Sequence, residues 1–202
     1  FLRASDLGMS GENNEWKPVI QDKLSQQLLV PNGTMGQRWE EGKKWNLKLE
    51  TEDGTPIDPM LSMVESDYHV ETIQFPYFDS SGDGIFERPI ATRTIQLANG
   101  EEVKIATVYD LMTSQYGVQR FEHELEATSY DDASSKYTPA WQEQITGIKK
   151  ELVTKVAKEF AQNAIDTGGR SMIIMGAGIN HWFNSDTIYR SILNLVLLCG
   201  CQ

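Results

Sequence analysis

The residues from Ser171 to Asn184, SMIIMGAGINHWFN, join a short apolar run to the glycine pair Gly176 and Gly178. A glycine turn after a buried strand lets backbone N–H groups approach a phosphate, and the positive end of the following helix favours that anion. This order of residues is therefore typical of a dinucleotide-binding turn. The nicotinamide fingerprint G-x-G-x-x-G, however, needs a third glycine at position 181, where this chain has His181.

The residues after the glycine pair disfavour a standard NAD site. The third glycine of the fingerprint lets the helix pack tightly on the strand, and the bulk of His181, Trp182 and Phe183 forbids that packing. The acidic residue expected on the next strand also has no place, because only the letters GCQ follow the next apolar run. A partial glycine fingerprint is a weak signal. The alternative is an ordinary strand-to-helix connection in which Trp182 fills the core.

Helical sequence is expected on both sides of this turn. A first helix is predicted to follow Thr138 as N-cap, with Pro139 at its first position, and to stop at Gly147. A second helix is predicted over residues 149–164, and residues 186–200 have the apolar spacing of a third. The second helix places its apolar residues on one stripe: Leu152, Val156, Phe160 and Ala161.

The apolar run 171–175 predicts a short strand that is buried on both faces. With its neighbours it predicts a Rossmann-like helix–strand–glycine turn–helix unit of a parallel sheet, whose other strands would come from sequence beyond residue 202. We therefore expect a mixed α+β chain. Residues 1–108 form a β-rich segment with loops and a hairpin, and residues 109–202 form a helical α/β part.

Within the first half, residues 44–50, KWNLKLE, alternate apolar and polar residues as a half-buried strand does. Residues 68–78 are rich in β-branched and aromatic types, and Pro76 within them predicts an edge strand or a strand end. Two alternating runs flank Asn99 and Gly100, the pair most suited to a two-residue type I′ turn. These runs predict a hairpin.

Composition limits the partners of the chain. Its 202 residues, 40% of them hydrophobic, suffice for one large domain or two small ones. The formal net charge of −11, from 18 basic and 29 acidic residues, disfavours nucleic acid and anionic membrane surfaces. An anionic ligand would need a local basic site. Direct membrane insertion is not expected, because no stretch reaches the roughly 20 apolar residues of a membrane helix.

Three other candidate sites are better explained by ordinary structural features than by metal binding or catalysis. The stretch DSSGDGIFERPI has the early residues of a calcium loop, but its twelfth position is Ile90 instead of a bidentate Glu, so a solvated turn is favoured. The adjacent Asp131 and Asp132 are typical of an Asx turn or cap rather than of a metal or acid–base pair. Cys199 and Cys201 form no four-ligand set, so no metal site is predicted within the chain.

Resemblance to a known family is carried by the letters GRSMIIMGAGINHWFNSDTIYRSILNLVLLCGC. They resemble the molybdenum-binding alpha subunit of bacterial respiratory nitrate reductases, within the molybdopterin oxidoreductase (DMSO reductase) superfamily. The resemblance extends through YTPAWQEQITGI, VYDLMTSQYGVQR and PNGTMGQRWEEGKKWNL to nearly the whole chain. The cluster-binding His and Cys residues of the family and its molybdenum-ligating Asp are not among these motifs. Both ends look cut, so we expect an internal fragment.

The resemblance implies a ligand for the glycine turn. The family binds two molybdopterin guanine dinucleotides, which are large anions held between α/β domains. The implied cofactor-binding residues are Gly176, Ala177, Gly178, Asn180, His181 and Trp182. The backbone of the first three would approach the cofactor, and the side chains of Asn180 and His181 would supply hydrogen bonds toward its pterin end, near the metal. His181, close to the metal, is the one candidate catalytic side chain.

The resemblance also implies an activity and partners. The full subunit would reduce nitrate to nitrite at a molybdenum-bis(molybdopterin guanine dinucleotide) centre, and the ligands of its 4Fe-4S cluster would lie outside this chain. Electrons would arrive through an iron–sulfur beta subunit and a gamma subunit, a membrane cytochrome b, at the cytoplasmic face of the bacterial cell membrane. The isolated fragment is expected to be inactive and to self-associate. The alternative is a free-standing nucleotide-binding or interaction module without catalysis.

Overall fold

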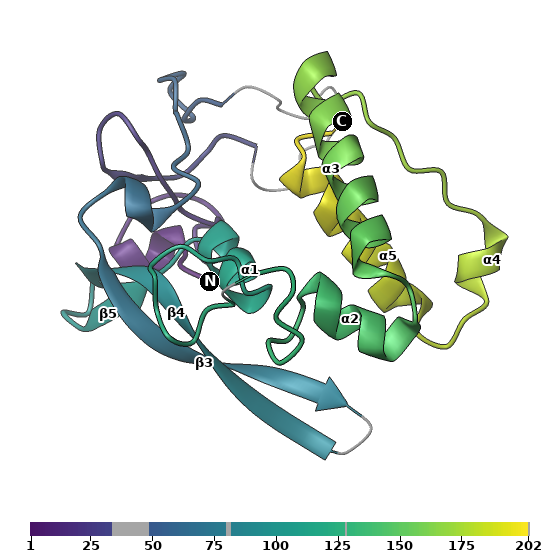
Figure 1. Ribbon diagram of the computed structural model, residues 1–202. Coiled ribbons are helices and arrows are strands. Elements are labelled where there is room, and N and C mark those ends of the chain that lie inside the picture. The colour runs from purple at the N-terminus through teal and green to yellow at the C-terminus, as the bar shows by residue number, and fades with distance from the viewer. Residues whose placement is uncertain (34–48, 80–81, 128, 202) are drawn as a thin grey trace. The chain divides into compact units, whose positions relative to one another are not determined.

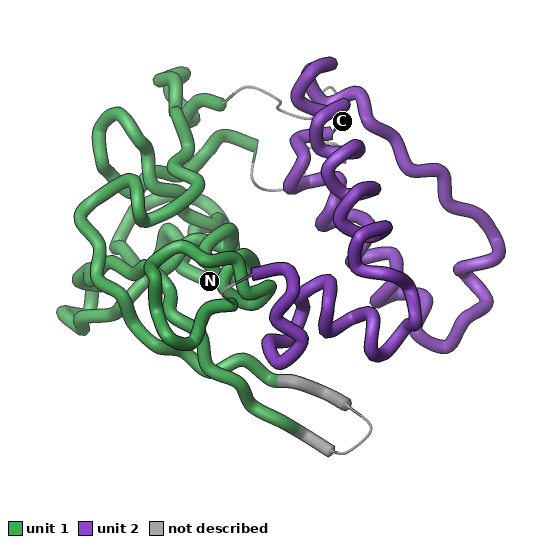
Figure 2. The backbone as a smooth tube through the Cα atoms, viewed as in Figure 1, with its two compact units in different colours: residues 1–127 green, residues 128–202 purple. Residues whose placement is uncertain are grey.

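The computed structural model describes residues 1–33, 49–79, 82–127 and 129–201. They divide into two compact units, Phe1–Ala127 (unit 1) and Thr128–Gln202 (unit 2), shown in Figure 2. Two antiparallel sheets and five α-helices occur in this described part, which confirms the mixed α+β class (Figure 1). The helices are α1 (Val108–Gln115), α2 (Pro139–Thr146), α3 (Lys150–Thr167), α4 (Ala177–Asn180) and α5 (Ser185–Leu198). No helix in these ranges is both long and apolar enough to cross a membrane.

Unit 1 is built on a three-stranded sheet in the order β3–β4–β5. The strands are β3 (His69–Asp79), β4 (Gly82–Gln96) and β5 (Glu102–Ile105). The edge position of β3 is the one that Pro76 predicts, because a proline has no N–H to donate to a second neighbour. Phe75 and Phe86 face each other across β3 and β4 with ring centroids 5.6 Å apart, and both are buried.

A second, two-stranded sheet in unit 1 pairs β1 (Ile20–Gln21) with β2 (Leu28–Leu29). The strand predicted over residues 44–50 lies outside the described residues except for its last two positions. There Glu50 forms an isolated antiparallel bridge with Pro56.

The predicted hairpin joins β4 to β5, but its turn is not the two-residue type I′ turn. The Leu97 N–H donates to the Glu101 carbonyl at 2.8 Å, and the Gly100 N–H donates to the Leu97 carbonyl at 2.9 Å. The loop therefore has three residues, and of these only Gly100 has a positive φ, at 85°. This is a type I turn followed by a left-handed glycine. A tertiary contact favours it, since the Ala98 N–H donates to the Asp6 carbonyl at 2.8 Å.

A fully buried carboxylate, that of Asp110 in the first turn of α1, joins the segments of unit 1. It accepts hydrogen bonds from the Ser62 hydroxyl at 2.6 Å, the Met63 N–H at 2.8 Å and the Thr107 hydroxyl at 2.8 Å. The Arg120 guanidinium completes the cluster with an ion pair at 2.5 Å. A buried charge needs this many partners to offset the loss of its hydration.

Helix α2 begins and ends where the sequence predicts. Helix α3 continues to Thr167, three residues past the range 149–164, α5 ends at Leu198, and the short helix α4 was not predicted. The Thr138 hydroxyl accepts from the Trp141 N–H at 3.1 Å and caps α2, and Gly147 ends α2 with a φ of 73°. Helix α3 ends at Gly168, which is also left-handed. The next residue, Gly169, has a positive φ of 87°, which favours glycine, and the space around it also excludes a side chain. A Cβ at this position would lie 2.3 Å from the Gly200 carbonyl oxygen, which follows α5.

The strand predicted over residues 171–175 does not form. No acceptor in the described ranges takes a hydrogen bond from the amides of residues 172–175, and Met172 and Ile174 are 77% and 86% exposed. A strand needs a neighbour to pair its N–H and C=O groups, and both described sheets belong to unit 1. In the predicted order helix–strand–turn–helix, an unpaired segment therefore takes the place of the strand.

The apolar faces of the unit 2 helices are only partly covered. On α3, Leu152 and Val156 of the predicted stripe are more than half exposed, and Ala164 is the one buried residue. Helix α5 has no buried residue. Contiguous exposed apolar surface of this kind marks an interaction site.

The Asp110 cluster predicts a large stability effect. Replacement Asp110→Asn removes the charge that neutralises Arg120 and places an N–H₂ group among donors. We expect a loss of about 3–5 kcal/mol in the free energy of unfolding of unit 1, measured by urea denaturation. The matched control Glu124→Gln, at an exposed position, should change it by less than about 0.5 kcal/mol. Equal denaturation midpoints for the two variants would contradict this role of Asp110.

The exposed faces predict that the isolated 202-residue chain self-associates. Sedimentation velocity should show a mass that rises with protein concentration, because burial of apolar surface drives association. The replacement Leu197→Glu places a charge on the exposed face of α5 and should shift the distribution toward monomer. A strictly monomeric chain at high concentration would show that these faces do not associate.

Candidate functional site

The six predicted cofactor residues lie together on one exposed segment of unit 2. Gly176 is the N-cap of α4, Asn180 is its last residue and His181 is its C-cap. The residues of this segment from Gly176 to Asn184 are exposed or half-buried, and Trp182 is among the exposed ones. In Figure 1 this segment is part of the long connection that leads from the end of α3 through α4 to the start of α5. The glycine turn therefore lies on the surface of unit 2.

The two glycines of the turn are not required by the fold of unit 2. Gly176 has an extended backbone with φ −141°, and Gly178 has no positive φ, so other residues could adopt both conformations. A Cβ added at either position would meet no described atom within 4 Å. The open space in front of both residues fits the close approach of a group from outside unit 2.

The polar groups that this segment offers are hydrogen-bonding groups rather than metal ligands. The side-chain Oδ1 of Asn180 accepts a hydrogen bond from the Tyr189 hydroxyl of α5, which orients the side-chain amide. The amide then has its N–H₂ group available as a donor, and the exposed His181 imidazole adds a donor and an acceptor. No cluster of three metal-ligating side chains occurs within the described residues. This arrangement can bind and orient a polar ring system.

The two units differ in net charge. Unit 2 carries seven Lys and Arg residues against seven Asp and Glu residues, whereas unit 1 carries 11 against 22. The whole acidic excess of the chain therefore belongs to unit 1. The predicted repulsion of an anionic ligand does not apply to the glycine turn, because unit 2 has no net charge.

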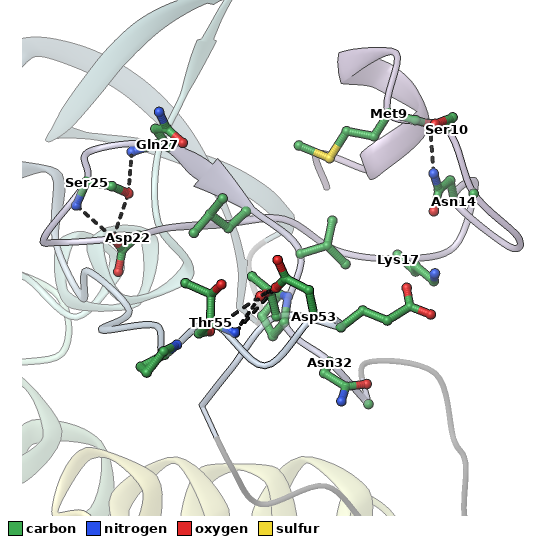
Figure 3. Close-up of a pocket in the computed structure, with 18 residues that line it drawn as sticks. Met9, Ser10, Asn14, Lys17, Asp22, Ser25, Gln27, Asn32, Asp53 and Thr55 are labelled. Atoms are coloured by element: carbon green, nitrogen blue, oxygen red, sulfur yellow. Dashed lines mark hydrogen bonds between the residues drawn. The ribbon is translucent and has the colours of Figure 1, made fainter.

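A cavity of about 560 Å³ lies in unit 1 (Figure 3). Its polar groups hold its own loops together. Asp22 accepts from the Ser25 N–H and hydroxyl at 2.7 and 2.6 Å, and from the Asp58 N–H at 2.8 Å. These bonds, led by the Ser25 hydroxyl, lower the pKa of Asp22, and the hydroxyl of Thr51 lowers the pKa of Asp53 in the same way. Because the carboxylates of Asp22 and Asp53 are engaged in these hydrogen bonds, we assign this cavity no ligand chemistry.

The simpler interpretation of the other candidates is confirmed for the adjacent aspartates but not for the stretch that resembles a calcium loop. Asp132 accepts from the Ser134 N–H and hydroxyl at 3.0 and 2.6 Å, which is an Asx turn, and Asp131 pairs with Lys150 at 2.6 Å. The solvated turn expected over the stretch that resembles a calcium loop was wrong for its described residues, because Asp79 ends β3 and residues 82–90 belong to β4, where Phe86 and Ile90 are buried. Strands therefore take the place of the two helices of an EF-hand. Burial raises the pKa of the half-buried Cys199 thiol, and both cysteines are free.

Sequence reasoning did not find the cluster around Asp110 and Arg120. These residues stand ten positions apart, with their partner Ser62 a further 48 positions from Asp110. One local signal existed: Thr107 and Asp110 have the spacing of a helix N-cap and the acidic residue three positions later, and the Asp110 N–H donates to the Thr107 hydroxyl at 2.9 Å. Asp110 is fully buried and the Arg120 side chain is 16% exposed, so we assign the cluster a role in the stability of unit 1.

Curated proteins match the chain from end to end. It is 53% identical, over all of its residues, to the nitrate reductase alpha chain of Bacillus subtilis (strain 168), of which it covers 16%. Identity is 41% over the whole chain to the respiratory nitrate reductase 1 alpha chain of Escherichia coli (strain K12), with 17% of that protein covered. It is 42% over 99% of the chain to the nitrate reductase alpha subunit of Mycobacterium tuberculosis (strain CDC 1551 / Oshkosh), with 16% covered.

No protein-family model matches the chain. The chain spans about one sixth of the length of these relatives, since the covered share is 16–17%. The matched regions nevertheless extend over 99–100% of the chain. The chain therefore belongs to the family of nitrate reductase alpha chains.

Proposed function

We propose that this chain is part of a catalytic subunit that reduces nitrate to nitrite, and that its exposed glycine turn forms part of the cofactor cradle. The observation that carries the first half is the 53% identity to a nitrate reductase alpha chain across every residue. An identity of this size over a whole chain supports a shared role for the segment. The free-standing module has no observation in its favour, since every relative named above is about six times longer.

The cofactor of the proposed subunit is a molybdenum-bis(molybdopterin guanine dinucleotide). Its bound metal supplies oxygen-atom transfer from nitrate, and the protein supplies binding and orientation. The glycine turn fits such a group for three reasons. The backbone at Gly176 and Gly178 is open to close approach, the Asn180 amide is oriented by Tyr189, and unit 2 has no net negative charge to repel an anion.

In this proposal each side chain of the turn has a separate task. The backbone N–H groups of the turn bind an anionic part of the cofactor. The Asn180 amide and the His181 imidazole donate hydrogen bonds to polar atoms of the pterin, and His181 holds its ring close to the reacting centre. Trp182, which is exposed in unit 2, covers an apolar face of the cofactor and keeps water away from it.

The proposed partners follow from the word respiratory in the name of the Escherichia coli relative. An iron–sulfur beta subunit and a membrane cytochrome b gamma subunit would deliver the electrons, through a 4Fe-4S cluster whose ligands lie outside this chain. The subunit would then be peripheral, at the cytoplasmic face of the membrane.

The role of His181 predicts a functional loss without a loss of folding. In the full-length alpha subunit, His181→Ala removes a hydrogen bond to a charged or strongly polar ligand, at a cost of about 1.5–3 kcal/mol. That cost corresponds to a roughly ten- to hundredfold decrease in molybdenum content or nitrite turnover. Thermal unfolding should be unchanged. The control is His69→Ala, which removes an exposed histidine from β3 and should leave both quantities as they are. A His181→Ala enzyme with normal molybdenum, full turnover and a lower melting temperature would make His181 a structural residue.

The glycine turn predicts a failure of cofactor loading. In the full-length subunit, Gly176→Val should abolish molybdenum incorporation, because a branched side chain fills the space through which the cofactor approaches the backbone. Valine can adopt the extended φ of −141° and meets no described atom, so unit 2 itself should tolerate it. The matched control is Thr187→Val, on the exposed surface of α5. Molybdenum content is measured by mass spectrometry of the metal, and a fully loaded Gly176→Val subunit would refute the cradle.

A further inference from the structure

One side-chain hydrogen bond ties the segment of the glycine turn to α5. The Tyr189 hydroxyl donates to Oδ1 of Asn180, the last residue of α4. Within the described part of the chain, it is the one hydrogen bond that a side chain of residues 176–184 makes, since the other bonds of this segment join backbone groups. The orientation of the Asn180 amide therefore depends on Tyr189.

Tyr189 is the better fixed of the two residues. It lies in the second turn of α5 and is half-buried, whereas Asn180 is exposed. A tyrosine has only two side-chain torsions, so the helix largely determines where its hydroxyl lies. The far end of α5 is held in turn, because the Gly200 carbonyl oxygen lies so close to Gly169 at the end of α3 that a Cβ does not fit between them. A held residue thus orients an exposed one.

The direction of this hydrogen bond determines which group of Asn180 is left for a ligand. A side-chain amide has an acceptor oxygen and a donor N–H₂ group, and a free amide can rotate to present either. Here the hydroxyl occupies Oδ1, so the N–H₂ group is the part that remains available. A pterin ring has acceptor atoms, namely its carbonyl oxygen and ring nitrogens, as well as donor N–H groups. An amide with this orientation selects an acceptor atom.

We propose that Tyr189 is a positioning residue of the nitrate-reducing centre. It acts through Asn180, whose amide it holds as a hydrogen-bond donor to an acceptor atom of the pterin. This inference rests on the proposed cofactor cradle, and it adds a residue and a hydrogen-bond direction that the cradle alone does not specify. A donor stabilises the electron-rich state of an anionic ligand, so the oriented amide raises the reduction potential of the bound metal.

The substitution Tyr189→Phe in the full-length alpha subunit removes the hydroxyl and keeps the ring. We expect normal molybdenum content, a roughly two- to tenfold lower nitrite turnover and a lower midpoint potential of the metal in a redox titration followed by electron paramagnetic resonance. The shift in potential should be smaller than that of Asn180→Ala, because a released amide still donates for part of the time. The matched control Tyr130→Phe, at an exposed tyrosine of unit 2, should leave all three quantities unchanged.

A double variant tests whether Tyr189 acts through Asn180. Once Asn180→Ala has removed the amide, adding Tyr189→Phe should not lower the potential further. An additive shift in the double variant, or a wild-type potential in Tyr189→Phe, would overturn the proposal. If Tyr189→Phe does not fold, Asn180→Asp decides, because it keeps an acceptor for the hydroxyl and replaces the N–H₂ group by oxygen. Unchanged molybdenum content and potential in Asn180→Asp would show that the bond only attaches α4 to α5.

The same measurements separate this proposal from the cradle on which it rests. If the cradle itself is wrong, Gly176→Val loads molybdenum normally and Asn180→Ala leaves the potential unchanged. If only the role of Tyr189 is wrong, Gly176→Val fails to load and Asn180→Ala lowers the potential, but Tyr189→Phe does not.

Discussion

The buried carboxylate of Asp110 joins three parts of unit 1: the 3-10 helix η3 (Met63–Glu65), the start of α1 and the loop at Arg120. Desolvation of a carboxylate costs several kcal/mol unless partners replace its water. Here the Ser62 and Thr107 hydroxyls, a backbone N–H and a guanidinium replace it. The four partners come from three separate segments of the chain, so the cluster fixes the arrangement of elements that the small sheet alone would leave open.

The same requirement, that buried polar groups be paired, explains the shape of unit 2. Its helices satisfy their own backbones, with caps at Thr138, Gly147 and Gly168. The apolar segment 171–175 cannot satisfy its backbone within the described residues, so it stays exposed together with much of α5. Unit 2 exposes apolar side chains that other protein segments could cover, which agrees with a family whose members are about six times longer.

Sequence reasoning succeeded where the controlling contacts are local. The Thr138 cap, the Gly147 stop and the edge strand with its proline each depend on a few adjacent residues. It was wrong where a distant group decides: the turn before β5 follows a hydrogen bond from Ala98 to a remote carbonyl, and the strand at 171–175 lacks its neighbours. The glycine turn was located by its residue types. The structure adds that neither the backbone conformation nor the packing of unit 2 requires glycine at positions 176 and 178.

The most direct test of this account is an experimental structure of the full-length alpha subunit with its molybdenum cofactor bound. We predict that the backbone of Gly176–Gly178 lies against the cofactor and that a ring nitrogen of His181 is within about 3 Å of a polar cofactor atom. The account would be contradicted by a structure in which the turn packs against other protein atoms and the His181 ring points to solvent. In that case the glycines would serve a domain interface, and the cradle would be built entirely by other parts of the subunit.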